Sequence, residues 1–208
     1  MLLQGRYCPQ ITVFAAARLP ARSAGRPSGN ARGGPIRGPA ATMIAMKKRW
    51  KPNVTVAAVI ENDGRFLLIE EHTPEGLRLN NPAGHLDPAE SPQEGAVREV
   101  LEETGCAFTP LAVVGIYLGR FQRPARGEDV TYLRIAYSGT VGEPLPGRTL
   151  DHGIVRTLWM TLDEVRASAA RHRSTMVLRS IEDHVAGKRY PLTLITTEAS
   201  VYLPDLLP

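Results

Sequence analysis

Residues 84–106 read GHLDPAESPQEGAVREVLEETGC, and this stretch carries the strongest structural signal in the chain. Ser91 is a good helix N-cap, and the proline after it suits the first helical position, where its missing N–H would be unpaired anyway. Glu94 lies three residues after Ser91 and completes a capping box. Gly105 can adopt the left-handed conformation that ends many helices. The stretch therefore predicts a helix over residues 92–104.

Three glutamates gather on one face of this predicted helix. Glu99, Glu102 and Glu103 stand at positions i, i+3 and i+4, so their carboxylates lie close together and repel one another. A divalent cation among them would relieve the repulsion, and oxygen ligands at this density suit Mg²⁺ or Mn²⁺ better than Zn²⁺. On its own the spacing is typical of a solvated acidic helix face, so the residues around it must decide between the two interpretations.

The spacing of the whole stretch resembles the signature of the Nudix hydrolase family, G-x5-E-x7-R-E-U-x-E-E-x-G-U, in which U is a bulky aliphatic residue. Gly84, Glu90 and Arg98 fill the first three fixed positions, and the three glutamates and Gly105 fill the others. Only Cys106 departs from the pattern, at the final U position, where Ile, Leu or Val is usual. The match favours a metal site over a solvated acidic face.

The resemblance implies a metal-binding role for four residues. Glu99, Glu102 and Glu103 would bind Mg²⁺, with Mn²⁺ as an alternative, and the backbone carbonyl of Gly84 would be a further ligand. Glycine at that position lets the loop approach the metal closely. Glu99 or Glu102 would also serve as, or hold, the general base that activates water. No organic cofactor is expected.

Two further motif residues would support the glutamates. Arg98 would orient its neighbours, and Glu90 would pair with Arg98 and so hold the loop that precedes the helix. The alternative is a surface ion pair worth about 0–1 kcal/mol. Many Nudix enzymes add an acidic residue from a loop outside the motif, and Glu128, Asp129 and Asp151 are the candidates in this chain.

Several aromatic residues and one histidine are candidates for contacts with a substrate. His85 follows the first motif glycine and could face either a substrate phosphate or solvent. Tyr117, Phe121 or Tyr132 could stack on a base, with packing between strands as the alternative for each. Trp159 is expected to pack on the core beside the last strand.

The charge is unevenly distributed along the chain. Residues 1–60 carry ten Lys/Arg and no Asp or Glu, whereas residues 61–208 carry fifteen Lys/Arg and twenty-one Asp/Glu. The net charge of +4 therefore reflects the N-terminal segment and gives no argument for nucleic-acid binding. Two cysteines, Cys8 and Cys106, provide no disulfide framework, and a reducing, cytoplasmic location is expected. No apolar run reaches the roughly 18–20 residues of a membrane span.

One folded domain is expected over residues 47–196, followed by an irregular tail over 197–208. Residues 1–46 are rich in Arg, Gly, Ala and Pro, lack a hydrophobic period and should be disordered. Three interpretations are open for this segment. It is an upstream-start artefact with Met43 or Met46 as the real first residue, a targeting peptide, or a basic tail that contacts a partner.

Hydrophobic patterning predicts strands on both sides of the helix. Residues 62–64, Asn-Asp-Gly, mark a hairpin turn, and residues 120–129 form a polar loop. The predicted strands are 54–60, 65–70, 77–81, 111–118, 130–138 and 154–160, with a further candidate at 192–195, and further helices begin at the capping box 161–164 and span 174–186. This order suits a mixed α/β fold, and the family resemblance implies the Nudix α/β/α sandwich with a mixed central sheet.

Features outside the motif resemble one branch of the family, the NudJ-type phosphatases. The shared runs are KPNVTVA (51–57), NPAGHL (81–86) and RYPL (189–192). This resemblance implies Mg²⁺-dependent hydrolysis of phosphoanhydride bonds in nucleoside tri- and diphosphates and in thiamine-pathway pyrophosphates, namely thiamine pyrophosphate and hydroxymethylpyrimidine pyrophosphate, with release of orthophosphate. The expected partner is a small-molecule substrate, and the expected assembly is a monomer or homodimer.

Three other functions are alternatives. The chain could hydrolyse ADP-ribose or another nucleoside diphosphate linked to a further group. It could act on RNA 5′ ends, with the basic N-terminal segment as a phosphate-binding arm. It could bind a nucleotide as a sensor without cleaving it, although such Nudix domains usually lose a motif glutamate and all are present here.

Overall fold

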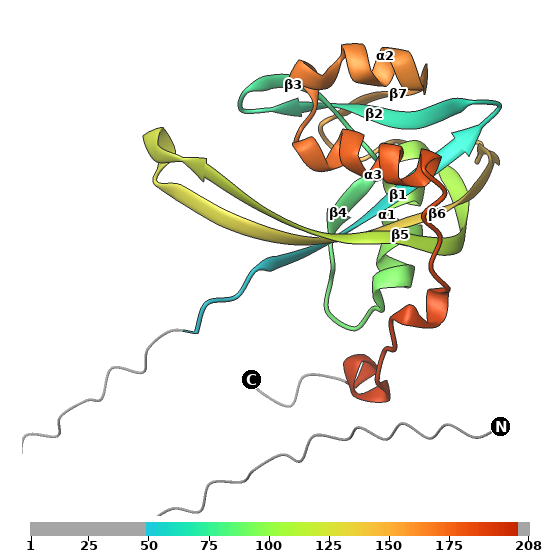
Figure 1. Ribbon diagram of the computed structural model, residues 1–208. Coiled ribbons are helices and arrows are strands. Elements are labelled where there is room, and N and C mark those ends of the chain that lie inside the picture. The colour runs from blue at the N-terminus through green and yellow to red at the C-terminus, as the bar shows by residue number, and fades with distance from the viewer. Residues whose placement is uncertain (1–48, 204–208) are drawn as a thin grey trace, which may run out of the picture. The chain divides into compact units, whose positions relative to one another are not determined.

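The computed structural model describes residues 49–203, and Figure 1 shows how their helices and strands are arranged. The expected disorder of residues 1–46 lies outside this range. The strands are β1 (Asn53–Asn62), β2 (Arg65–Thr73), β3 (Gly76–Asn80), β4 (Ala83–His85), β5 (Cys106–Arg123), β6 (Glu128–Pro144) and β7 (Ile154–Thr161). The helices are α1 (Pro92–Thr104), α2 (Leu162–Ala167) and α3 (Thr175–Val185), and 3₁₀ turns span Pro124–Arg126, Ala169–Arg171, Leu192–Leu194 and Ala199–Tyr202. Within residues 49–203, no helix is both long and apolar enough to span a membrane.

The strands form a mixed sheet around β1. β1 pairs in parallel with β6 and antiparallel with β4, and β5 extends the sheet from β6. The hairpin between β1 and β2 closes at Asp63 and Gly64, whose φ angles are 49° and 72°. Positive φ at both positions is what the Asn-Asp-Gly turn requires. β2 continues the sheet by pairing with both β3 and β7.

The apolar run of β1 is buried on both faces of the sheet. Val56 belongs to the core beneath α1, which includes Val100 of that helix. Ala57, the next residue, belongs to the second core, which includes Val177 of α3. Because neighbouring residues in a strand point to opposite faces, a continuous apolar run is needed when helices cover both sides. α1 covers one face and α2 and α3 the other, which confirms the predicted α/β/α sandwich (Figure 1).

Helix α1 has the predicted bounds and both predicted caps. The Glu94 N–H donates to Ser91 Oγ at 3.2 Å, and the Ser91 N–H donates to the Glu94 carboxylate at 2.8 Å. Gly105 ends the helix in the left-handed region at φ 73°. The Tyr202 hydroxyl donates to Glu94 at 3.0 Å, so the C-terminal segment is joined to the start of α1.

The segment predicted as a loop at 120–129 is instead the tip of a long hairpin, and this prediction was wrong. β5 extends to Arg123 and β6 begins at Glu128, with a 3₁₀ turn between them. Cross-strand ion pairs stabilise the tip: Arg123 contacts Glu128 at 3.0 Å, and Arg120 Nε donates to Asp129 at 2.7 Å. Exposed strands rich in charged residues resemble a loop in sequence because neither face is buried in an apolar core.

Two smaller predictions also need correction, and one strand was not predicted. The segment 192–195 is a 3₁₀ turn rather than a strand, and the strand-like pairing lies earlier, where Tyr190 bridges to Val113. Trp159 does not pack in the core, because 39% of its surface is exposed on β7. The short strand β4 had no counterpart among the predicted elements. The capping box at 161–164 and the helix over 174–186 are confirmed by α2 and α3.

Replacing the N-cap of α1 should destabilise the protein. Ser91→Ala removes the hydroxyl that accepts from the Glu94 N–H, and loss of such a cap typically costs about 0.5–2 kcal/mol. Urea unfolding of the purified protein measures this change in the free energy of unfolding.

Ser174→Ala is the matched control, because Ser174 is the N-cap residue of α3 but makes no capping hydrogen bond. Its hydroxyl is buried without a hydrogen-bond partner among the described residues, so its loss should leave stability nearly unchanged. Equal effects of the two substitutions would contradict the role assigned to Ser91.

Candidate active site

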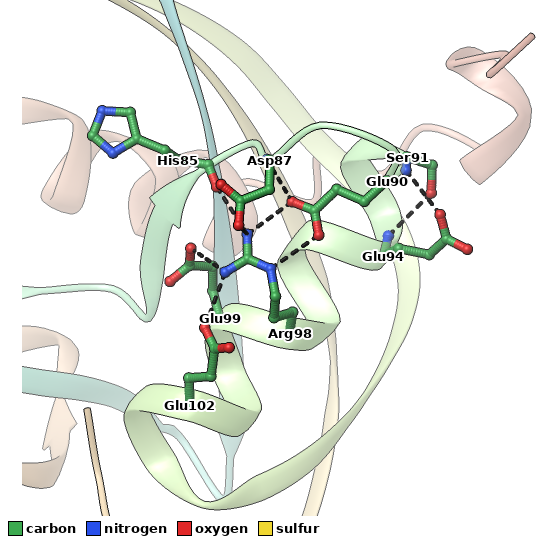
Figure 2. A network of polar contacts seen from close by, with 8 residues as sticks. All are labelled: His85, Asp87, Glu90, Ser91, Glu94, Arg98, Glu99 and Glu102. Carbon is green, nitrogen blue, oxygen red and sulfur yellow. Dashed lines mark hydrogen bonds and ion pairs between the residues drawn. The ribbon is translucent and has the colours of Figure 1, made fainter. Parts of the chain in front are cut away.

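Arg98 is the centre of a polar network on α1 (Figure 2). Its Nε and Nη2 donate to the Glu90 carboxylate at 2.9 and 2.7 Å, and Nη2 also donates to the His85 carbonyl oxygen at 2.9 Å. Its Nη1 donates to Glu99 at 2.7 Å and to Glu102 at 2.9 Å. One guanidinium therefore joins the loop after β4 to two of the three motif glutamates.

The pairing of Arg98 with Glu90 is more than a surface ion pair. The Glu90 side chain is only 14% exposed, and its carboxylate also accepts from the Asp87 N–H at 2.8 Å. The hydrogen bond from Arg98 is the main cause that lowers the pKa of Glu90. Gly95 leaves the space that this carboxylate fills, because a Cβ there would lie 2.7 Å from the Glu90 Oε1 atom. The loop before α1 is thus held by bidentate contacts.

Gly84 and Glu99 approach each other very closely. A Cβ on Gly84 would lie 2.1–2.3 Å from the Glu99 carboxylate, so only glycine allows this contact. One turn further along, the Glu103 carboxylate accepts from the Ala83 N–H at 2.7 Å. The structure therefore brings the predicted residues Gly84, Glu99 and Glu103 together where α1 meets β4, and it holds Glu102 beside Glu99 through Arg98.

Burial and mutual repulsion act on these carboxylates. Burial raises the pKa of Glu99, and the hydrogen bond from Arg98 opposes that change. The pKa of Glu103 is raised to about 9, chiefly by burial, and the charges of Glu99, Glu71 and Asp151 raise it further against the opposing hydrogen bond from Ala83. Crowded carboxylates with raised pKa values are the arrangement that a cation would stabilise in the charged form.

The donor set fits a divalent cation, although the side chains do not form a ready-made site. Across residues 49–203, no three acidic, histidine or cysteine side chains are arranged to hold a metal ion, and Arg98 donates to both Glu99 and Glu102. The donors nevertheless suit Mg²⁺, because they are carboxylate oxygens. Gly84 has no side chain, so its backbone lies directly beside the Glu99 carboxylate. The assignment of metal ligands remains a prediction.

The fold separates the three candidate loop acids. Glu128 and Asp129 each pair with an arginine of the β5–β6 hairpin. Asp151 instead lies beside the end of α1: its N–H donates to the Glu102 carbonyl oxygen at 3.0 Å, and its charge raises the pKa of Glu99. Glu71 of β2 also acts on this cluster, and nothing in its sequence spacing could have revealed it.

A cavity of about 150 Å³ adjoins the glutamate cluster at β4. Gly84 and His85 line it from β4, and Tyr132 and Arg134 line it from β6. Figure 2 shows the His85 ring pointing away from Arg98, and this ring lies 6.0 Å from the ring of Tyr132. Arg134 is 6% exposed, and burial lowers its pKa to about 10. Sequence reasoning did not single out Arg134.

The predicted aromatic candidates fall into two places. Phe121 and Tyr132 line the small cavity, with ring centroids 5.7 Å apart. Tyr117 lies instead in a larger groove of about 780 Å³ between β5 and α3, where its hydroxyl donates to Asp183 at 3.1 Å. This larger groove contains none of the motif residues, so its size gives no argument that it is the reactive site.

Comparison with known proteins places the chain in a family. The family model for the NUDIX domain matches residues 50–179. The chain belongs to the Nudix hydrolase family. Phosphatase NudJ of Escherichia coli (strain K12) is 33% identical over 146 residues, which cover 70% of this chain and 92% of NudJ. A NUDIX hydrolase from Nitrosomonas europaea is 51% identical with a TM-score of 0.65, covering 71% of this chain and 98% of the other. The MutT NUDIX hydrolase from Burkholderia pseudomallei is 25% identical with a TM-score of 0.52, covering 64% and 98%.

These comparisons confirm the family and the fold expected from the motif. As a Nudix hydrolase, the chain is an enzyme that hydrolyses phosphoanhydride bonds in small nucleotide-type substrates. The motif helix that carries Glu99, Glu102 and Glu103 lies wholly inside the matched region.

Neutralising a motif glutamate should abolish most of the activity without unfolding the protein. Glu102→Gln and Glu103→Gln keep the side-chain shape and replace one carboxyl group of the helix face with a neutral amide. Turnover should fall by orders of magnitude, because the lost carboxylate can no longer hold a cation or orient water. Steady-state hydrolysis in Mg²⁺, with melting temperature measured in parallel, checks this prediction.

Glu143→Gln is the control for these two variants, because Glu143 is exposed near the end of β6 and makes no ion pair among the described residues. It should retain full turnover. Near-normal turnover in both motif variants would contradict the proposed role of the helix face.

The geometry around Arg98 should matter as much as its charge. Arg98→Lys keeps one positive charge but loses the fork that contacts Glu90 and Glu99 together. We expect turnover to fall by roughly 10- to 100-fold, because small misplacements of a reacting group carry penalties of this size. Arg65→Lys is the control: Arg65 is exposed, and its Nη1 makes only long contacts, at 3.4 Å with the Trp159 carbonyl oxygen and at 3.5 Å with Glu164. Equal turnover in both variants would mean that Arg98 does not position the glutamates.

Proposed function

We propose that this Nudix hydrolase is a Mg²⁺-dependent phosphatase of the NudJ type. Its substrates would be thiamine pyrophosphate, hydroxymethylpyrimidine pyrophosphate and nucleoside tri- and diphosphates, from which it would release orthophosphate. The observation that carries the proposal is the 33% identity to Phosphatase NudJ over 92% of that protein, which extends well beyond the family motif. Presence of every motif glutamate supports catalysis rather than nucleotide sensing.

The metal ligands in this proposal come from α1 and β4. Glu99, Glu102 and Glu103 would supply carboxylate oxygens, and Gly84 would supply its carbonyl oxygen. Bound Mg²⁺ neutralises phosphate charge and lowers the pKa of a coordinated water. The contact between Gly84 and Glu99 supports this set, because it brings the backbone and one carboxylate to the same point.

The protein's own groups would then position the nucleophile. Arg98 holds Glu99 and Glu102 by hydrogen bonds of 2.7 and 2.9 Å, and one of these two carboxylates would accept the proton of the attacking water. Attack at the terminal phosphorus breaks its bond to the bridging oxygen. The products are orthophosphate and a monophosphate ester when the substrate is a diphosphate, or orthophosphate and a nucleoside diphosphate when it is a triphosphate. Both glutamates remain candidates for the base, since Arg98 contacts each of them.

The proposal also includes a cytoplasmic location. Cys106 is a free, buried thiol, which fits a reducing compartment.

A substrate panel in oxygen-18 water tests the proposed activity. The panel contains thiamine pyrophosphate, hydroxymethylpyrimidine pyrophosphate, nucleoside di- and triphosphates, ADP-ribose, diadenosine polyphosphates and a 5′-triphosphorylated RNA, each with Mg²⁺ and each repeated with the Glu103→Gln protein. We expect labelled orthophosphate from the first three classes, because attack at the terminal phosphorus places the solvent oxygen in that product. Label in the monophosphate ester would instead locate attack at the inner phosphorus.

Two other outcomes would overturn the proposal. Release of AMP from ADP-ribose or the dinucleotides, without turnover of the pyrophosphates, would assign a different Nudix specificity. Binding without hydrolysis of any member would favour a nucleotide sensor.

A further inference from the structure

The small cavity beside Gly84 contains a buried arginine that pairs with no carboxylate among the described residues. Arg134 is 6% exposed; its Nη1 reaches only Asn80 Oδ1, at 3.4 Å, and its Nε has no partner in residues 49–203. Two other arginines line the same cavity, and each does pair with a carboxylate: Arg123 at 2.9 Å and Arg173 at 2.6 Å. The charges of Glu103 and Glu71 act on Arg134 from beyond ion-pair distance, but they do not accept its hydrogen bonds. Burying a guanidinium without strong acceptors is unfavourable, so this exception indicates a ligand that supplies a hydrogen-bond acceptor.

Two hydroxyl groups in the cavity are also without partners. Thr55 Oγ1 and Ser174 Oγ are buried and make no hydrogen bond within the described residues. Thr55 lies opposite Arg134 in the pairing of β1 with β6, so both side chains lie on the same face of the sheet. Ser174 comes from the start of α3, where it leaves its capping position unused. Unpartnered polar groups are rare in protein interiors, and here three belong to residues that line one cavity.

The remaining walls of the cavity suit a flat ring. Phe121 and Tyr132 lie with ring centroids 5.7 Å apart, and the buried Met176 closes another side. Glycine at position 119 lets Phe121 and Met176 keep these positions, since a Cβ there would lie 3.3–3.4 Å from both side chains. A cavity of about 150 Å³ is comparable to one that accepts a single benzene ring in another protein.

We propose that this cavity binds the organic ring of the substrate and selects a single-ring nitrogen heterocycle. Arg134 donates to a ring nitrogen or an exocyclic oxygen, because a guanidinium has donors only. The hydroxyls of Thr55 and Ser174 can donate or accept, so they bind neighbouring groups of the ring. The inference rests on the proposed function, because the ring must carry the diphosphate that the glutamates hydrolyse.

The cavity lies next to the motif glutamates, as this proposal requires. Ala83 and Gly84 line the cavity, and the same two residues contact Glu103 and Glu99. A ring seated against them therefore directs an attached diphosphate toward the motif glutamates. Arg134 is a specificity residue in this arrangement rather than part of the hydrolytic machinery.

Binding of a non-hydrolysable product tests the inference independently of turnover. Isothermal titration with hydroxymethylpyrimidine monophosphate is compared with titration of methyl phosphate, which has the same charged group but no ring. Arg134→Met preserves side-chain length and removes the buried charge, so the fold should tolerate it. We expect the affinity for the pyrimidine compound to fall about 10- to 100-fold, with binding of methyl phosphate unchanged.

Arg120→Met is the matched control. Arg120 lies on the same hairpin, pairs with Asp129 and alternates with Phe121, so it points to the other face of the sheet. Its substitution should leave both titrations unchanged. If Arg134→Met fails to fold, Ser174→Ala provides the second variant, with an expected loss of roughly 2- to 10-fold in pyrimidine affinity alone.

Two results would overturn the inference. Unchanged pyrimidine binding in the folded variants would mean that the cavity does not hold the ring. Equal loss of both probes would assign Arg134 to the phosphate instead. Failure of the proposed function would give a different result. The wild-type protein would bind the pyrimidine monophosphate, and Arg134→Met would weaken that binding, but the wild-type protein would release no orthophosphate from the pyrophosphate.

Discussion

The close approach of α1 to β4 at Gly84 is the constraint on which the candidate site depends. A side chain at this position would overlap the Glu99 carboxylate, so glycine sets how near the helix can come to the strand. Hydrogen bonds fasten the approach on both sides: Glu103 accepts from the Ala83 N–H, and Arg98 donates to the His85 carbonyl oxygen. The two residues of β4 that flank Gly84 are thus bonded to α1, and the acidic face of the helix cannot turn away from the strand.

The acidic face adds little to the stability of the helix that carries it. Burying the carboxylates of Glu99 and Glu103 is unfavourable, and Arg98 offsets this only for Glu99, since Glu103 keeps a strongly raised pKa. Stability comes from elsewhere in α1, namely its two caps and the burial of Ala96 and Val100 against the sheet. The residues that stabilise α1 are therefore different from the glutamates expected to act in hydrolysis. The glutamates can be crowded together without unfolding the helix.

Sequence alone predicted features whose signals are local and missed those that depend on distant neighbours. The caps at Ser91 and Gly105 define the bounds of α1, because both act within one turn of the chain. The hairpin at 120–129 was mistaken for a loop, since cross-strand pairing rather than apolar patterning stabilises it. The cavity was missed for the same reason. Arg134 and Ser174 come from different elements and meet only through sheet pairing and the packing of α3, so no spacing in the sequence marks them.

The register of the sheet connects this cavity to the hydrolytic site. Thr55 of β1 lies opposite His85 on one side and opposite Arg134 on the other. Because side chains alternate along a strand, a shift of β6 by one residue would turn Arg134 into the apolar core beneath α1 and bring Ile135 into the cavity. The apolar run of β1 is buried on both faces and cannot specify that register by itself. The buried polar groups can specify the register, since only one pairing of β1 with β6 places Arg134 beside Thr55 at the cavity. The residues proposed to bind the ring of the substrate therefore also help to determine the register between β1 and β6.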